Sequence, residues 1–251
     1  MSIPTIAFSQ VSALPKAHSH NDYEHERPLF DALDNGFCSV EADIFLVNGE
    51  LLVGHTRDKL QSEMTLESLY LKPLLERYRK YNGKIFPNVS DFYLWIDLKK
   101  DGREIYPKLK ELLTRYDEMI TGFDGDTKIS DGILIILSGD RPVELVLQEK
   151  ERRYVTLDGL ITDLDSDTSC NFIPVISADW NSLFTWRGEG IMPEEQKKVM
   201  KTHIQKAHQA GRKIRYWGIP DNKIFWEFCN QNGIDFLNTD HLSELRKFLL
   251  P

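Results

Sequence analysis

Cysteine is scarce in this sequence. The 251 residues include three cysteines, Cys38, Cys170 and Cys229, which are widely spaced and form no CxxC pair. Zinc knuckles and disulfide frameworks need closely and regularly spaced cysteines. We therefore expect three buried free thiols, not a cysteine-based metal site or a disulfide scaffold.

Positive charge is also in short supply. Lysine and arginine number 31 against 39 aspartates and glutamates, so the net charge is -8. Nucleic-acid binding usually depends on a basic face, and we expect no nucleic-acid partner. An anionic substrate would need local positive charge from a metal ion, a lysine or an arginine.

Long apolar runs are missing as well. No segment is long and apolar enough to span a membrane. The first ten residues are mildly apolar but lack the basic and apolar regions of a complete signal peptide. We interpret residues 1–15 as an N-terminal extension that could be a signal-peptide remnant. The protein would then be periplasmic or secreted, and otherwise cytoplasmic; its oligomeric state is unknown.

The sequence does contain a regular alternation of strand-like and helix-like segments. Eight short strand-like segments alternate with helical patterns, which is typical of parallel pairing with crossover helices. No GxGxxG follows a strand, and no Pro/Ser-rich linker or repeat divides the chain. We predict one domain over residues 16–251, an α/β fold of the (β/α)8 TIM barrel type. The predicted strands are 16–20, 39–46, 92–98, 132–137, 159–161, 174–177, 213–217 and 235–238.

Helices are predicted where apolar residues recur at helical spacing between turn signals. Segments 122–131 and 163–171 are polar and read as loops, and 177–191 reads as a long loop near the active side. The predicted helices are 28–34, 65–81, 105–116, 141–148, 193–210, 223–232 and 242–250.

The second predicted strand carries the most informative residues. Glu41 and Asp43 are two positions apart, so both side chains point to the same face. Two neighbouring carboxylates repel each other, and burying them unpaired is costly. A bound cation would resolve both problems. His55 follows after a short extended return, which places a candidate acid/base beside a candidate metal site.

The barrel prediction brings further residues to the same place, because functional groups of this fold lie at the carboxyl ends of its strands. Asp97 and Lys99 share a face at the end of the third strand. Glu41, Asp43 and Asp97 would supply three hard oxygen ligands, which suit one Mg²⁺ or Ca²⁺ better than zinc. The first strand ends with His18 and His20, and the residues alone do not decide between them.

The ordered motifs resemble the phosphatidylinositol-specific phospholipase C-like phosphodiesterase superfamily, near the glycerophosphodiester phosphodiesterases. Those enzymes carry a His at the first strand end, then E-x-D, then a His after a short hairpin. The resemblance implies hydrolysis or transesterification of a small-molecule or lipid phosphodiester. The matching residues are His20, Glu41-Ala42-Asp43, His55, Asp97-Leu98-Lys99, Arg215-Tyr216-Trp217 and Phe236 to Asp240, from the first strand to the last.

The resemblance also implies roles. His20 and His55 would form the acid/base pair, and Glu41, Asp43 and Asp97 would hold one divalent cation. Four residues would bind substrate: Asn21, Lys99, Arg215 and Trp217. For Arg215 a salt bridge within the barrel, and for Trp217 a filling role at the mouth, stay open as alternatives.

Two positions depart from the glycerophosphodiester phosphodiesterase pattern. The arginine usual after the first histidine is Asn21 here, and the aspartate usual after the second is Thr56. The substrate headgroup therefore stays undetermined. We also interpret Asp240 as the N-cap of the last helix, and His203 and His208 as solvent-facing.

Two other functions compete. The His18-x-His20 pair resembles the opening ligands of metal-dependent amidohydrolases, which would also need histidines at the ends of the middle strands. None stands there. The second alternative is a non-catalytic carbohydrate- or lipid-binding barrel, which the complete set of site residues disfavours.

Overall fold

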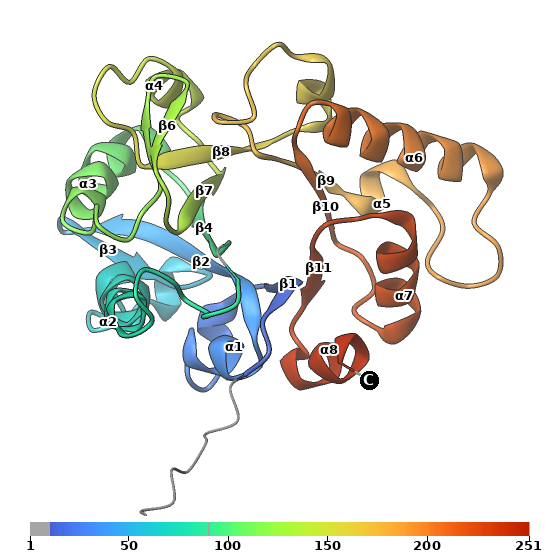
Figure 1. Ribbon diagram of the computed structural model, residues 1–251, viewed down its shortest axis with the longest axis horizontal. Coiled ribbons are helices and arrows are strands. Elements are labelled where there is room, and N and C mark those ends of the chain that lie inside the picture. Colours follow the sequence, from blue (N-terminus) through green and yellow to red (C-terminus); the bar gives the residue numbers. More distant parts are fainter. Residues whose placement is uncertain (1–10, 90, 251) are drawn as a thin grey trace, which may run out of the picture.

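Eight parallel strands follow one another around a ring in the computed structural model, which describes residues 11–89 and 91–250 (Figure 1). The pairing order is β10-β9-β8-β7-β4-β2-β1-β11. A parallel bridge between Arg215 and Phe236, with the Asp235 amide 3.1 Å from the Ile214 carbonyl, joins the two ends of this order. The predicted (β/α)8 barrel is confirmed. The strands are β1 Leu14–Ser19, β2 Phe37–Val47, β4 Tyr93–Leu98, β7 Leu134–Gly139, β8 Val155–Gly159, β9 Val175–Asp179, β10 Lys213–Trp217 and β11 Leu237–Thr239.

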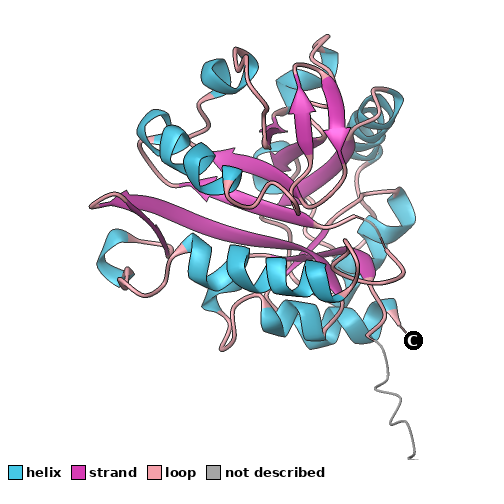
Figure 2. Ribbon diagram, turned by 60° about the vertical axis from the view of Figure 1, so that its left-hand side comes forward, coloured by secondary structure: helices cyan, strands magenta, loops and turns pink. Residues whose placement is uncertain are grey.

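Helices cover the outside of this ring (Figures 1 and 2). They are α1 Phe30–Asp34, α2 Lys72–Lys80 with the preceding turn Glu67–Leu71, α3 Gly102–Thr114, α4 Val143–Leu147, α5 Trp180–Leu183, α6 Glu194–Gln209, α7 Lys223–Asn232 and α8 Leu242–Leu249. The limits of α7 agree with the prediction, because both ends carry strong local signals. The Asn222 side chain accepts hydrogen bonds from the first-turn amides, and Gly233, at φ 81°, ends the helix.

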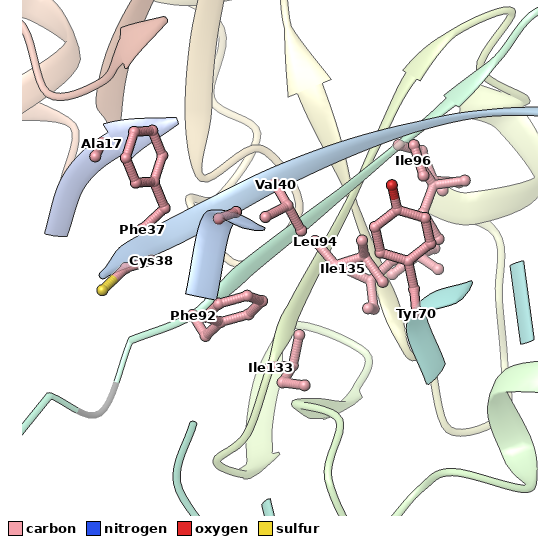
Figure 3. Close-up of a cluster of buried hydrophobic side chains, with 14 of the residues drawn as sticks. Ala17, Phe37, Cys38, Val40, Tyr70, Phe92, Leu94, Ile96, Ile133 and Ile135 are labelled. Atoms are coloured by element: carbon pink, nitrogen blue, oxygen red, sulfur yellow. The ribbon is translucent and has the colours of Figure 1, made fainter. Parts of the chain in front are cut away.

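Apolar side chains fill two separate spaces, as strand alternation requires. The outward-facing residues Val40, Leu94 and Ile135 pack under the helices, together with Tyr70 (Figure 3). Inside the barrel, a second buried cluster packs around the Trp95 ring; it comprises Tyr93, Trp95, Ile136, Val175 and Phe236. The inner cluster closes the barrel below its mouth, so polar groups placed above it face the open end.

A short hairpin extends the second barrel strand. The antiparallel strand β3, Glu50–Val53, pairs with the end of β2 through Ile44–Val53 and Val47–Glu50. The predicted extended return before His55 is therefore confirmed. It brings His55 back over the strand that carries the two carboxylates.

Two predicted loops are wrong. Segment 122–131 forms a hairpin of β5 Gly122–Asp124 and β6 Thr127–Ser130, which its polar composition concealed. Segment 177–191 is not an open loop, because β9 continues to Asp179 and α5 follows. Trp180 is fully buried and donates its indole N–H to the Trp186 carbonyl, at 2.9 Å. Both tryptophans of this segment, Trp180 and Trp186, pack in the outer core.

Smaller differences concern segment ends and the chain start. The fifth barrel strand precedes the predicted segment 159–161, and a short helical turn, Ile161–Asp165, occupies part of the expected loop 163–171. The first ten residues of the predicted extension lie outside the described residues, and β1 begins at Leu14. Within the described residues, no helix has the length and apolarity needed to cross a membrane. All three cysteines are free, although Cys170 is only half-buried.

Candidate active site

Three carboxylates meet at the inner face of two neighbouring strands. Glu41 and Asp43 lie on β2, and Asp97 lies beside Asp43 in the parallel register of β2 and β4. One oxygen from each residue lies within 4.8 Å of the others. The intervening Ala42 packs outward in the core. The strand alternation that predicted a shared face therefore produces the cluster directly.

The neighbouring strand β7 makes room for Asp97. The Ser138 hydroxyl donates to Asp97 Oδ2 at 3.0 Å. Gly139 follows at φ +69°, and a β-carbon there would lie 2.7 Å from Asp97 Oδ1 and 2.5 Å from the Leu98 carbonyl. Glycine is required at this point by both the backbone conformation and the close approach of the carboxylate.

Two permanent cations face the three carboxylates. Lys99 Nζ lies 3.0 Å from Asp43 Oδ2 and 3.6 Å from Asp97 Oδ1. Arg215 donates to Glu41 Oε2 at 2.8 Å. Burial and the neighbouring Asp43 charge raise the pKa of Asp97. When all three carboxylates are ionised, they carry one negative charge more than Lys99 and Arg215 neutralise. This excess favours a further positive charge at the cluster.

The donor set fits a divalent cation. Asp43 Oδ2 receives Lys99 and further donors, whereas its buried Oδ1 accepts no hydrogen bond from the described residues. Carboxylate oxygens are the ligands that Mg²⁺ and Ca²⁺ prefer. Glu41, Asp43 and Asp97 are the residues that would hold such an ion.

His55 stands beside this cluster, about half exposed. Its Nδ1 lies 3.1 Å from Asp43 Oδ2, with 47 % of the side chain exposed. The Tyr23 hydroxyl donates to the same oxygen at 2.7 Å and lies 3.3 Å from His55 Nδ1. Tyr23 was not predicted as a site residue, because nothing in the local sequence links it to β2 or to His55.

His20 is the second exposed histidine at the mouth. Its Nδ1 lies 2.9 Å from Asp240 Oδ1, and 38 % of its side chain is exposed. Burial lowers the pKa of His20, but the Asp240 hydrogen bond and the charges of Glu41 and Asp240 outweigh it and raise the pKa overall. The prediction that Asp240 caps the last helix is wrong. The N-cap residue of α8 is His241, and the Asp240 carboxylate turns to His20.

His18, two residues before His20 on the same strand, occupies a different environment deeper in the barrel. It is fully buried, with Nδ1 2.7 Å from the Ser39 hydroxyl and Nε2 2.9 Å from Glu41 Oε2. Burial and the Arg215 charge lower the pKa of His18 to about 4, so the ring is neutral at neutral pH. His18 therefore holds Glu41 in place. The two histidines do not converge on one position, which disfavours the amidohydrolase arrangement.

Arg215 is engaged by the protein itself. Its guanidinium is buried, donates from Nε to Asn238 Oδ1 at 3.0 Å, and lies 4.6 Å from the centre of the Trp95 ring. Burial alone would raise the pKa of Glu41, but Arg215 and His18 hold it well below its ordinary range. In this structure Arg215 forms a salt bridge within the barrel, which was the alternative to a substrate-binding role.

The two remaining predicted substrate residues border the mouth. Trp217 ends β10 and is 45 % exposed. Asn21 follows β1 in a left-handed conformation, at φ 45°, which asparagine tolerates well. Its Oδ1 lies 3.1 Å from the Tyr23 hydroxyl. Asn21 therefore joins the group around Asp43 and His55.

The two histidines on α6 lie in different environments. His203 Nδ1 lies 3.2 Å from the Tyr216 hydroxyl and is half-buried, and His208 Nε2 lies 2.8 Å from Asp235 Oδ2. His208 is exposed, as predicted, and the prediction is wrong for His203, which is half-buried. Both lie on the outer helix, away from the carboxylate cluster on the inner face.

Sequence comparison assigns a family to this arrangement. Residues 7–158 match the AIM6-like phosphodiesterase domain. The chain belongs to this family. Relatives named altered inheritance of mitochondria protein 6 are 30 % identical in Eremothecium gossypii, over 95 % of this chain and 70 % of theirs, and 34 % identical in Lachancea thermotolerans, over 94 % and 66 %. These names describe no chemical reaction.

Solved structures share the fold at low sequence identity. A glycerophosphodiester phosphodiesterase from Parabacteroides distasonis has a TM-score of 0.55 at 16 % identity, covering 95 % of this chain and 98 % of its own. A calcium-dependent phosphoinositol-specific phospholipase C from a Pseudomonas species has a TM-score of 0.56 at 13 % identity, covering 91 % and 89 %. The expected resemblance to this superfamily is confirmed.

Proposed function

We propose that this protein is a phosphoric diester hydrolase of lipid metabolism that acts on a glycerophosphodiester or phospholipid-type substrate. One observation carries the proposal. Two exposed histidines, each held through Nδ1 by an aspartate, lie at the same barrel mouth as a cluster of three carboxylates. Such a set combines acid–base groups with a site for positive charge, which a phosphodiester requires.

The carboxylate cluster is assigned to one divalent cation, Mg²⁺ or Ca²⁺. Glu41, Asp43 and Asp97 would hold it, and when bound it supplies positive charge to the non-bridging phosphate oxygens. Lys99 provides a second positive charge beside Asp43. Arg215 and His18 keep Glu41 ionised and correctly turned.

The histidines are assigned to proton transfer. One histidine takes the proton of the attacking hydroxyl as the oxygen of that hydroxyl bonds to phosphorus. The other protonates the leaving alkoxide as the bond between phosphorus and the alkoxide oxygen breaks. The attacking hydroxyl belongs to water, or to a neighbouring group of the substrate if a cyclic phosphate forms first. With Nδ1 held by an aspartate, each ring has Nε2 left for this work.

Three features support His20 over His18 for this role. His20 is partly exposed at the mouth, its pKa is raised mainly by the hydrogen bond to Asp240, and both ring nitrogens of His18 are occupied. The substrate class is supported by a likeness of fold. A phosphodiesterase from Oleispira antarctica with this fold, at a TM-score of 0.53, was solved with sn-glycerol-3-phosphate.

The test is turnover of bis(p-nitrophenyl) phosphate with Mg²⁺, with Ca²⁺ and with chelator alone. We expect activity with a divalent ion and a loss of about 10²–10⁴-fold in kcat for His20→Ala and for His55→Ala. The control is His208→Ala, which removes a histidine of similar exposure on the outer helix. Thermal unfolding checks that all variants fold.

Two outcomes would contradict the proposal. Activity that survives both substitutions would remove the acid–base assignment. No turnover with either ion, on a panel of glycerophosphodiesters, lysophospholipids, inositol phospholipids and sphingomyelin, would favour a non-catalytic binding barrel. Two zinc ions per chain would point to another class of metal hydrolase.

A further inference from the structure

Arg141 is the one arginine of the described residues whose side chain makes neither a hydrogen bond nor an ion pair. Every other arginine donates to a carboxylate, a hydroxyl, an amide oxygen or a backbone carbonyl. Arg141 is also partly buried, so its surroundings restrict the water that can replace a partner. A guanidinium keeps its charge and its fork of donors at any physiological pH, which makes this side chain a candidate anion-binding group.

The turn that carries Arg141 is fixed at the mouth of the barrel. β7 ends level with Leu98, at the end of β4. The Asp140 amide then donates to the Leu98 carbonyl at 2.7 Å, and the Asp140 carboxylate accepts the Gly102 amide at 2.9 Å. The buried Pro142 restrains the backbone on the other side of Arg141. A ligand would therefore have to order only the side chain of Arg141, which lowers the cost of binding.

The charge of Arg141 reaches the β8 side of the mouth. The pairing order places β7 between β4, which carries Asp97, and β8, which carries Asp158. Leu157 packs in the outer core, so Asp158 faces the barrel interior. Burial raises the pKa of Asp158 to about 7, and the charge of Arg141 is among those that lower it. On the other side of β7, Lys99 is the cation that faces Asp97. The mouth therefore carries positive charge at two separate places.

We propose that Arg141 binds a second acidic group of the substrate, a carboxylate or a phosphate on its alcohol portion, so that the preferred substrate is a phosphodiester with an acidic headgroup. This inference rests on the proposed function, which assigns the reacting phosphate to the carboxylate cluster and the two histidines. A guanidinium can donate two parallel hydrogen bonds to either kind of anion. A neutral or cationic headgroup would leave the guanidinium unpaired.

The charges at the carboxylate cluster support a separate place for the second acid. When all three carboxylates are ionised, they exceed Lys99 and Arg215 by one negative charge. A divalent cation would turn this into an excess of one positive charge, which the single negative charge of a phosphodiester balances. The charge of Arg141 is not needed for that balance, so it is left for a further anion.

The neighbouring Asp158 does not exclude an anion at Arg141. With its pKa raised by burial to about 7, the carboxyl of Asp158 is substantially neutral at neutral pH. A bound anion nearby would favour the neutral form further. The neutral carboxyl has an O–H group that can donate to the anion. An ammonium group in the same place would instead be repelled by Arg141.

Paired probes that differ in a second acid test the site without depending on turnover. Calorimetry with Mg²⁺ or Ca²⁺ present would compare O-phosphoserine with phosphoethanolamine for a carboxylate, and propane-1,3-diyl bisphosphate with n-propyl phosphate for a phosphate. We expect the wild type to bind the acidic member of at least one pair roughly tenfold or more tightly. That advantage should fall roughly tenfold in Arg141→Gln and return in part in Arg141→Lys. It should persist in the control Arg79→Gln, which removes an exposed positive charge on α2.

The outcomes separate this inference from the proposed function. Equal binding within both pairs, or an advantage of the acidic probes that survives Arg141→Gln, would overturn the second-acid site even if the protein hydrolyses phosphodiesters. A loss of affinity in Arg141→Gln that is equal for acidic and neutral probes would place Arg141 on the phosphoryl group and would also overturn the inference. An advantage that needs Arg141 would support the inference even where no diester is turned over.

Discussion

The polar side chains on the inner face of the barrel differ sharply between the strands near β2 and the strands β8 and β9. On the first side, Glu41 is bound by His18 and Arg215, and Asp97 is bound by Ser138. On the second side, Asp158 and Ser177 are also buried, and Asp158 Oδ1 and Ser177 Oγ have no hydrogen-bond partner within the described residues. The two sides therefore differ in how completely the protein pairs their polar atoms.

The two sides also differ in charge. Arg215 and His18 keep the pKa of Glu41 well below its usual range, whereas burial dominates at Asp158 and raises its pKa to about 7. Paired carboxylates can be buried as anions, and an unpaired one gives up part of its charge. The difference separates a carboxylate that the protein pairs with a cation from one that it leaves partly unpaired.

The largest expected effect comes from breaking the ion pair between Glu41 and Arg215. Glu41→Gln removes a charge from the carboxylate cluster and leaves the buried Arg215 without its carboxylate partner. We expect kcat/KM to fall by roughly 10³-fold and the free energy of unfolding to fall by about 3 kcal/mol. Steady-state kinetics and urea denaturation measure the two effects. The exposed control Glu111→Gln should change neither, and an unaltered stability of Glu41→Gln would show that the pair contributes little.

The partner of His20 provides the next test. Asp240→Asn removes the carboxylate whose charge and charge-assisted hydrogen bond raise the pKa of His20, and leaves the Glu41 charge, which raises it, against burial, which lowers it. The limb of the pH–rate profile that reports His20 should move to lower pH, with a rate loss of about 10–100-fold at neutral pH. A profile of kcat/KM from pH 5 to 9 measures the shift. A limb that stays in place would mean that Asp240 does not control His20.

Removing the charge of Asp158 should stabilise the protein. The pKa of Asp158 is raised from 3.8 to about 7 on folding, so the folded state disfavours the ionised carboxylate, and the cost grows as pH rises toward 7. We expect the advantage of Asp158→Asn over the wild type to grow by about 2 kcal/mol between pH 5 and pH 8. Urea denaturation at both pH values checks this. A constant difference, like that of Asp124→Asn, would contradict the raised pKa.

The smallest effect is expected at Tyr23. Tyr23→Phe removes one of the donors on Asp43 Oδ2, while His55 and Lys99 remain in contact with the same oxygen. We expect kcat to fall by about 3–10-fold with little change in stability. Kinetics beside thermal unfolding would show this. A loss as large as that of His55→Ala would instead place the Tyr23 hydroxyl in the reaction itself.

Local patterns predicted much of the fold and part of the site. The alternation of strands and helices predicted the barrel, and Gly233 predicted the end of α7. The two-residue spacing of Glu41 and Asp43 predicted their shared face. The hairpin at 122–131 and the burial of Trp180 were not predictable, because polar composition and an aromatic pair do not reveal what they pack against.

The sequence by itself determined that two carboxylates face one way, that a histidine follows a short return, and that the strands alternate with helices. Only the tertiary structure decided the partners: Asp240 for His20, Tyr23 for Asp43, and Arg215, 174 positions away in the chain, for Glu41. The physical reason is that spacing along one strand fixes only the face a residue occupies. Contacts between strands depend on barrel closure and register, which are set by the packing of the whole chain.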